Sequence, residues 1–264
     1  MTNKEFSNGF DTLLNSYASR IAFGDSDSPT SIEVDEYEKS LSLTNAQTEI
    51  VVGLYNGRNP LGEGFEQSEE LRRYLAPLVK EHTCSVATHG NSFPVGSDPK
   101  VKYFTLPDDC WFITLESVDV TSGDDCRTGG TLDVYPVRQD EYHKIKRNPF
   151  RGANYRRALR LDLSDGLVEI VADYTIKTDN GKGYHITYIR KPKPIILADL
   201  DGLEIDGYTF GGDVEPQENS EENKVYGNKV CELPDVLHQK ILERAVAEVL
   251  KSKGYNINNN KDSK

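Results

Sequence analysis

The feature that most constrains the fold is the segment CELPDVLHQKILERAVAEVLKSKG at residues 231–254. Pro234 suits the first turn of a helix, and Gly254 suits the position after its end. Between them, apolar residues form two adjacent rows at a spacing of four: Leu237, Ile241, Ala245 and Val249 beside Leu242, Val246 and Leu250. A stripe of this width predicts a helix that must bury one face against other helices.

The first eighty residues supply candidate partners for that helix. Apolar residues recur at spacings of three and four within 6–21, 35–55 and 65–78, which predicts three amphipathic helices. Asn56-Gly57 favours the end of the second helix, and Pro77 the end of the third. We therefore expect a four-helix bundle that the C-terminal helix completes.

In the middle of the chain, apolar residues recur at a different spacing. From about residue 83 apolar residues alternate, which predicts β-strands. Residues 156–191 contain three such runs, so we expect an antiparallel meander with a tight hairpin turn at Asn180-Gly181. A stiff proline segment should follow, with a short hairpin at Asp201-Gly202, and the acidic residues 213–229 should form a mobile loop.

Helices before and after a strand-rich segment predict an α+β fold, in which a helical bundle of three N-terminal helices and a C-terminal helix carries an inserted antiparallel β-rich domain. The bundle should comprise residues 1–82 and 230–255, and the inserted domain residues 83–229. Residues 256–264, rich in Asn and Lys, should form a disordered tail.

Composition argues against several functional classes. The 264 residues carry a net charge of −12, whereas a protein that reads DNA sequence normally presents a basic face. No run approaches the roughly 18 apolar residues of a membrane span, and the polar stretch MTNKEFSNGF lacks the apolar region that a secretory signal would have. We therefore expect a protein that folds in a cytoplasm, or in a particle assembled there, with no membrane partner. Its four widely spaced cysteines should be free thiols.

Motifs for chemistry are scarce. His82, Cys84 and His89 lie close together, and Cys110 or Cys126 could complete a zinc site, but the spacing matches no common pattern. The sequence contains no phosphate-binding loop, dinucleotide fingerprint or hydrolase motif. We predict no catalytic residue, no metal, no cofactor and no enzymatic activity.

One stretch stands out against the acidic background. Residues 144–160, KIKRNPFRGANYRRALR, contain no acidic residue and seven basic ones: Lys144, Lys146, Arg147, Arg151, Arg156, Arg157 and Arg160. Three interpretations are open: a solvated loop that leads into a strand, a docking surface for an acidic face of a neighbouring subunit, or a nucleic-acid site that uses Phe150 and Tyr155 for stacking. The net charge disfavours the last, because the rest of the chain would repel phosphate.

Five segments, spread from residue 35 to residue 250, together resemble a known family. They are DEYEKSLSLTNAQTEIVVGLYNG, FEQSEELRRYL, NPFRGANYRRALRLDLSDGLVEI, HITYIRKPKPIIL and CELPDVLHQKILERAVAEVL. In this order they resemble virion structural proteins of crAss-like phages of Bacteroidales, the ring proteins beneath the portal of the short tail. Residues 84–135 and 213–229 contribute least to the resemblance. The layout is also similar to the head-to-tail adaptor of short-tailed phages.

The resemblance implies a homo-oligomeric ring of about twelve copies in the head-to-tail connector of the virion. Such a ring would sit below the portal, contact the portal and adjacent tail proteins, and line a channel through which double-stranded DNA passes without sequence recognition. It would assemble in the host cytoplasm, and the family offers no catalytic residue to carry over. Two alternatives stay open: a non-catalytic β-rich binding module on a helical stalk, and an enzyme with an unfamiliar site.

Overall fold

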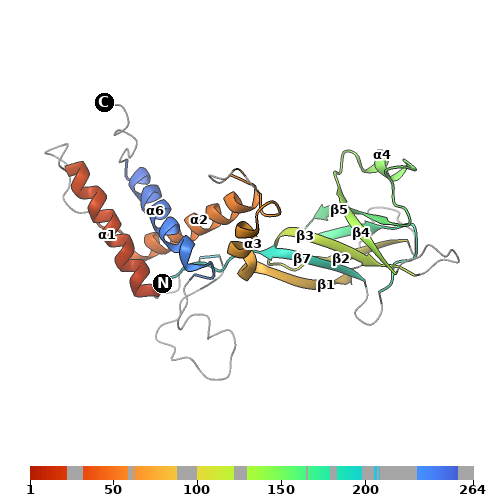
Figure 1. Ribbon diagram of the computed structural model, residues 1–264, viewed down its shortest axis with the longest axis horizontal. Coiled ribbons are helices and arrows are strands. Elements are labelled where there is room, and N and C mark those ends of the chain that lie inside the picture. Colours follow the sequence, from red (N-terminus) through yellow and green to blue (C-terminus); the bar gives the residue numbers. More distant parts are fainter. Residues whose placement is uncertain are drawn as a thin grey trace, which may run out of the picture. The chain divides into compact units, whose positions relative to one another are not determined.

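The computed structural model describes residues 1–22, 32–58, 62, 64–87, 100–121, 130–164, 166–178, 183–197, 205–206, 208 and 231–254 (Figure 1). The chain divides into two compact units. One comprises residues 1–78 with 192–264, and we call it the helical unit. The other comprises residues 79–191, and we call it the barrel unit.

The helical unit is organised around its C-terminal helix. Its elements are α1 (Asn3–Ala22), α2 (Glu36–Tyr55), α3 (Glu69–Leu75), the 3-10 turn η1 (Ala76–Leu78) and α6 (Asp235–Ser252). The helix α6 packs against both α1 and α2. All seven residues of its double apolar row are buried, together with Phe6, Phe10 and Leu14 of α1 and Leu43, Ala46 and Val51 of α2. The apolar residues at a spacing of four therefore form the face of α6 that packs against α1 and α2.

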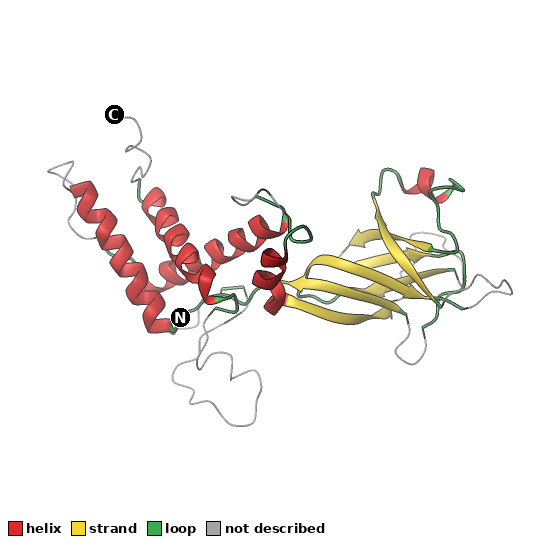
Figure 2. Ribbon diagram, in the orientation of Figure 1, coloured by secondary structure: helices red, strands yellow, loops and turns green. Residues whose placement is uncertain are grey.

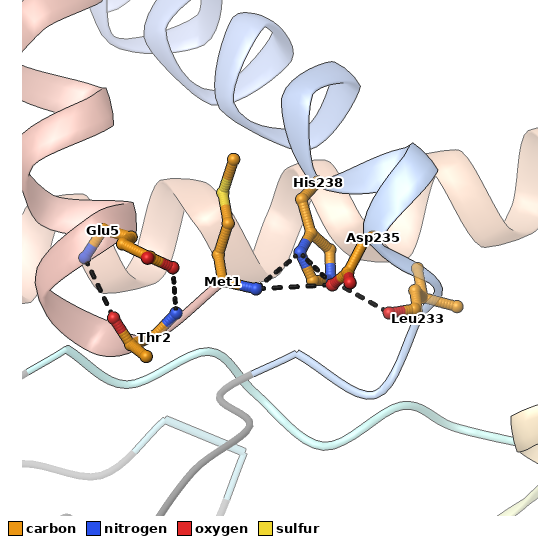
Figure 3. A network of polar contacts seen from close by, with 6 residues as sticks. All are labelled: Met1, Thr2, Glu5, Leu233, Asp235 and His238. Atoms are coloured by element: carbon orange, nitrogen blue, oxygen red, sulfur yellow. Dashed lines mark hydrogen bonds and ion pairs between the residues drawn. The ribbon is translucent and has the colours of Figure 1, made fainter.

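Polar contacts join the first residues of the chain to the start of α6 (Figure 3). The Met1 amino group lies 3.1 Å from His238 Nδ1 and 3.4 Å from the Asp235 carboxylate. The other ring nitrogen of His238 lies 2.9 Å from the carbonyl oxygen of Leu233, so this histidine is buried with partners on both sides. Thr2 and Glu5 exchange side-chain and backbone hydrogen bonds across the first turn of α1, an arrangement that satisfies free N–H groups at a helix start.

A stripe of polar side chains on α2 binds the proline-rich segment 192–197. Ser40, Thr44 and Gln47 recur at spacings of four and three, and all three are buried. The hydroxyl oxygens of Ser40 and Thr44 accept the backbone N–H groups of Leu197 and Ile195, each at 3.1 Å. No described strand pairs with segment 192–197. The α2 side chains therefore bond backbone groups that a neighbouring strand would bond in a sheet.

The barrel unit contains seven strands that close into a barrel in the order β1-β2-β6-β5-β4-β3-β7 (Figures 1 and 2). They are β1 (Val79–Ala87), β2 (Val101–Thr105), β3 (Cys110–Asp119), β4 (Thr131–Val137), β5 (Arg157–Ser164), β6 (Leu167–Val171) and β7 (Tyr184–Arg190). Every neighbouring pair is antiparallel except β4 and β5, which run parallel. The interior is filled by apolar side chains that include Phe104, Val118, Ile170, Tyr184 and Ile186.

The predicted fold class, a four-helix bundle with an inserted antiparallel β-rich domain, is wrong. The strands close into a barrel that includes a parallel pair, and the third predicted helix, α3, spans only seven residues before the chain enters β1. The predicted meander is also wrong, because β7 pairs with β1 and β3 and not with β6. Alternation of apolar residues identifies strands but carries no information about which distant strand completes a barrel.

Several other predictions fall outside the described residues. These are the hairpin turns at Asn180-Gly181 and Asp201-Gly202, the mobile loop at 213–229 and the disordered tail at 256–264.

Replacing one buried residue of α6 should test its role in the helical unit. Ile241 is fully buried and Val236 on the same helix is 63% exposed. We expect Ile241→Ala to lower the free energy of unfolding by about 2–5 kcal/mol, and the matched Val236→Ala by less than about 0.5 kcal/mol. Urea denaturation followed by far-UV circular dichroism measures both changes. Equal losses in the two variants would show that α6 does not hold the unit together.

Candidate functional site

The basic stretch forms the connection between the two parallel strands of the barrel. Parallel neighbours cannot be joined by a tight turn, and residues 138–156 make the longer crossover from β4 to β5. This crossover contains a short helix, α4 (Tyr142–Lys146), labelled at the upper right of Figure 1. Of the seven predicted interface residues, five lie in the crossover, and Arg157 and Arg160 lie in β5.

An apolar cluster fixes the crossover on the outer face of the barrel. Tyr142 and Ile145 of α4 pack against outward-facing residues of three strands: Val101 of β2, Leu159 and Leu161 of β5, and Val171 of β6. Strand β5 is therefore covered on both faces, because Ala158, which directly precedes Leu159, belongs to the barrel core. The crossover is a packed element of the barrel unit whose position is set by its contacts.

A buried carboxylate reinforces this attachment. The Tyr142 hydroxyl donates a hydrogen bond to Glu169 of β6, which is only 5% exposed. Lys146 donates to the Tyr142 oxygen at 3.1 Å and lies 4.0 Å from the Glu169 carboxylate. Burial, with Glu169 beside it, raises the pKa of the Tyr142 phenol, so this group stays a donor at neutral pH. Lys146 is therefore engaged with its own subunit.

Arg160 is turned into the barrel. Its guanidinium lies 2.5 Å from the carboxylate of Glu116 on β3, and the Tyr184 hydroxyl donates to the same carboxylate at 2.7 Å. Burial disfavours the charge on Arg160, but the Glu116 carboxylate outweighs this effect and raises the pKa of the guanidinium. Only 9% of Arg160 is exposed, which leaves little of it for another subunit.

Arg157 holds the turn that follows α4. It donates to the carbonyl oxygens of Phe150 at 2.8 Å and Gly152 at 3.2 Å. Gly152 is needed there because a Cβ atom would lie 2.7 Å from the carbonyl oxygen of Asn148. The Asn148 side chain also accepts the backbone N–H groups of Phe150 and Arg151. These contacts give the turn a defined shape without using the outward side chains.

The remaining four basic residues point outward. Lys144, Arg147, Arg151 and Arg156 are exposed, and we call them the outward cluster. Among the described residues these four form no ion pair, although Arg156 lies over the Tyr155 ring at 5.1 Å. Phe150, between them in sequence, is 87% exposed. The seven predicted residues thus divide into three with internal contacts and four that face solvent, and their role in a subunit interface stays a prediction.

The residues weighed as zinc ligands do not form a site. Cys84 is buried in the barrel, and burial raises the pKa of its thiol to about 12, so it is protonated at neutral pH. His82 is exposed on the same strand, and His89 and Cys126 lie outside the described residues. In the ranges that the structure describes, no three His, Cys, Asp or Glu side chains are grouped closely enough to hold a metal ion.

A chain of polar side chains on the outer face of the barrel was not predicted. The Thr83 hydroxyl lies 2.9 Å from His185 Nδ1, and His185 Nε2 lies 3.0 Å from Asp119. Although these residue types resemble a nucleophile, a base and an acid, Thr83 and His185 are directly opposite each other on β1 and β7. Strand register alone brings such pairs together, so we assign this contact to cross-strand stabilisation.

Sequence reasoning also missed Tyr142 and Glu169, the residues that attach the crossover. Their contact joins α4 to a strand 27 positions away, and no local pattern indicates it. Phe150 is predicted only as a stacking residue, and its position between Asn-Pro and Arg-Gly, in a turn, is a signal for its exposure. None of the helices in the described part of the chain is long and apolar enough to cross a bilayer.

Removing Arg160 should destabilise the barrel unit. Arg160→Met leaves the Glu116 carboxylate buried without its partner, and we expect a loss of about 3–5 kcal/mol in the free energy of unfolding. The double variant Arg160→Met with Glu116→Leu should lose less, because it leaves no unpaired buried charge. Trp111, the single tryptophan, lies in β3 and reports barrel unfolding by its fluorescence. An Arg160→Met protein of unchanged stability would mean that this arginine is free to contact another subunit.

Comparisons with known proteins identify the family. A family model described as phage tail ring protein 3/4 matches residues 1–261. The chain is 40% identical over 258 residues to "Ring protein 3" of Bacteroides phage crAss001, a match that covers 96% of each chain. It is 28% identical over 250 residues to "Ring protein 4/5" of the same phage, covering 93% of this chain and 91% of that protein. The resemblance to crAss-like phage ring proteins is confirmed, and the chain belongs to the phage tail ring protein 3/4 family.

Proposed function

We propose that this virion structural protein forms a ring in the head-to-tail connector, below the portal, around the channel through which DNA leaves the particle. About twelve copies would assemble in the host cytoplasm, in contact with the portal and adjacent tail proteins. The ring would have no cofactor and no enzymatic activity. Membership of the phage tail ring protein 3/4 family is the observation that supports a ring most strongly. The outward cluster, held on a packed crossover, offers a surface for a neighbouring subunit.

A closed ring of identical chains requires an interface in which one surface of a subunit meets a different surface of the next. The outward cluster supplies one such surface, because Lys144, Arg147, Arg151 and Arg156 face solvent beside the exposed Phe150. Exposed arginines with an aromatic side chain are the residue types that contribute most to protein interfaces. We therefore propose that the stretch 144–160 contacts a neighbouring protein subunit.

The net charge also suits a channel for DNA. Each phosphate that a protein neutralises adds to DNA affinity, and a chain with twelve excess acids provides few such contacts. A ring of these chains would let DNA pass without adhering to it. This part of the proposal concerns the whole ring, and the outward cluster would be covered by the neighbouring protein.

Microscopy of virions tests the ring and its place. Immunogold labelling with antibodies against this chain should mark one vertex of the particle, between head and tail. Averaged images of that vertex should show a ring with about twelvefold symmetry. Label over the capsid faces or on tail appendages would contradict the proposed position, and a vertex density without rotational symmetry would contradict the ring.

Reversing charge in the outward cluster should block incorporation. Arg147→Glu with Arg151→Glu places acids where an acidic partner should bind, so we expect particles to lack the variant. The control, Lys100→Glu with Lys177→Glu, makes the same charge change elsewhere on the barrel unit and should be incorporated. Both should stay folded, since surface changes usually shift stability by about 0.5 kcal/mol.

Quantitative immunoblots of purified virions measure incorporation, and thermal melting of the isolated variants checks their folding. If the Arg147→Glu, Arg151→Glu particles assemble normally and fail only in DNA retention or ejection, the outward cluster contacts DNA and the docking proposal is wrong.

A further inference from the structure

The two units carry very different charge. Residues 79–191, the barrel unit, contain 16 Lys and Arg and 16 Asp and Glu, so their charges cancel. Residues 1–78 and 192–264, the helical unit, contain 15 Lys and Arg against 27 Asp and Glu. The whole net charge of −12 therefore belongs to the helical unit.

Several acids of the barrel unit contact basic side chains of the same unit. The ion pairs are Asp109 with Lys80, Glu116 and Asp162 with Arg160, Asp140 with Arg138, and Asp173 with Lys100. Asp119 lies 3.0 Å from His185 Nε2. Glu169 is likewise covered by Tyr142 and Lys146. A second barrel unit thus has no net charge to attract the outward cluster of its neighbour, whereas a helical unit has twelve acids in excess.

We infer that the outward cluster of one copy docks on the helical unit of a second copy, with Phe150 as the apolar anchor of the contact. The inference rests on the proposed ring, since only a ring or another repeated assembly places a second copy within reach. Such a contact joins two different surfaces of the same chain, which is the head-to-tail geometry that lets identical subunits close a ring. In this contact, the charge difference between the two units would orient each subunit relative to the next.

The form of the outward cluster favours a protein over DNA as its partner. Phe150 is 87% exposed and its backbone is held by Asn148 and Arg157, so an apolar side chain is presented in a fixed position. Burying that ring in a protein surface removes apolar area from water, which favours the contact. The net charge of −12 also disfavours DNA, because a subunit of that charge repels phosphate.

Carbodiimide cross-linking of intact virions tests the inference, because this reagent joins a lysine amine to a carboxylate only where the two are in contact. The product is a band at twice the 29.6 kDa mass of the chain, which peptide mass spectrometry then maps. Lys144 supplies one amine. Arg147→Lys and Arg151→Lys keep the charge and supply two more, so the outward cluster is sampled at three positions.

We expect cross-links from these positions to Asp or Glu within residues 1–78 or 192–264. The control Lys144→Arg keeps the charge and should lose the Lys144 cross-link while its particles assemble normally. Cross-links to acids within 79–191, or to a different tail protein, would overturn the assignment to the helical unit and leave the ring proposal intact. Absence of any cross-link from all three positions would also overturn it. Failure of the ring itself is distinguished by microscopy, where no rotationally symmetric vertex density would be seen.

Discussion

The parallel pairing of β4 with β5 is the constraint on which the rest of the barrel unit depends. It is the one parallel pair among the described strands. Parallel neighbours cannot be joined by a tight turn, so this pair requires a long crossover. The crossover must lie on the outside of the barrel, and its apolar residues cover Leu159 and Leu161 there. The same segment presents the outward cluster. Strand topology thus determines where four exposed cations and Phe150 are displayed.

In both units, several buried polar groups have partners that hold a distant segment in place. Glu169 attaches α4 to β6, and Glu116 receives both Arg160 and Tyr184 inside the barrel. In the helical unit, Thr44 and Ser40 bind the extended segment 192–197 to α2. Leaving any of these groups unpaired would cost about 1–3 kcal/mol, more for the charged ones, so each contact is strongly directional. These polar contacts define which segments lie together, while the apolar clusters supply most of the stabilisation.

Local patterns predict the elements of this chain better than their partners. The double apolar row of α6 predicts its helix and its buried face, because a period of four is visible in any short window. The face of α2 that binds segment 192–197 is polar, so hydrophobic periodicity could not reveal it. The position of β7 between β1 and β3 depends on contacts between residues far apart in the sequence, since Val79 of β1 faces Ile189 of β7. The cluster of seven cations is visible in the sequence, whereas the inward turn of Arg160 depends on Glu116, 44 positions away.

A reconstruction of the tail vertex from purified virions would test the proposed role of the outward cluster most directly. We expect this chain in a closed ring, with Arg147, Arg151 and Phe150 buried against the helical unit of the next copy and Arg160 still paired with Glu116 inside its own barrel. A ring in which residues 144–156 face the DNA channel or solvent, with subunits joined through other surfaces, would contradict the proposed docking.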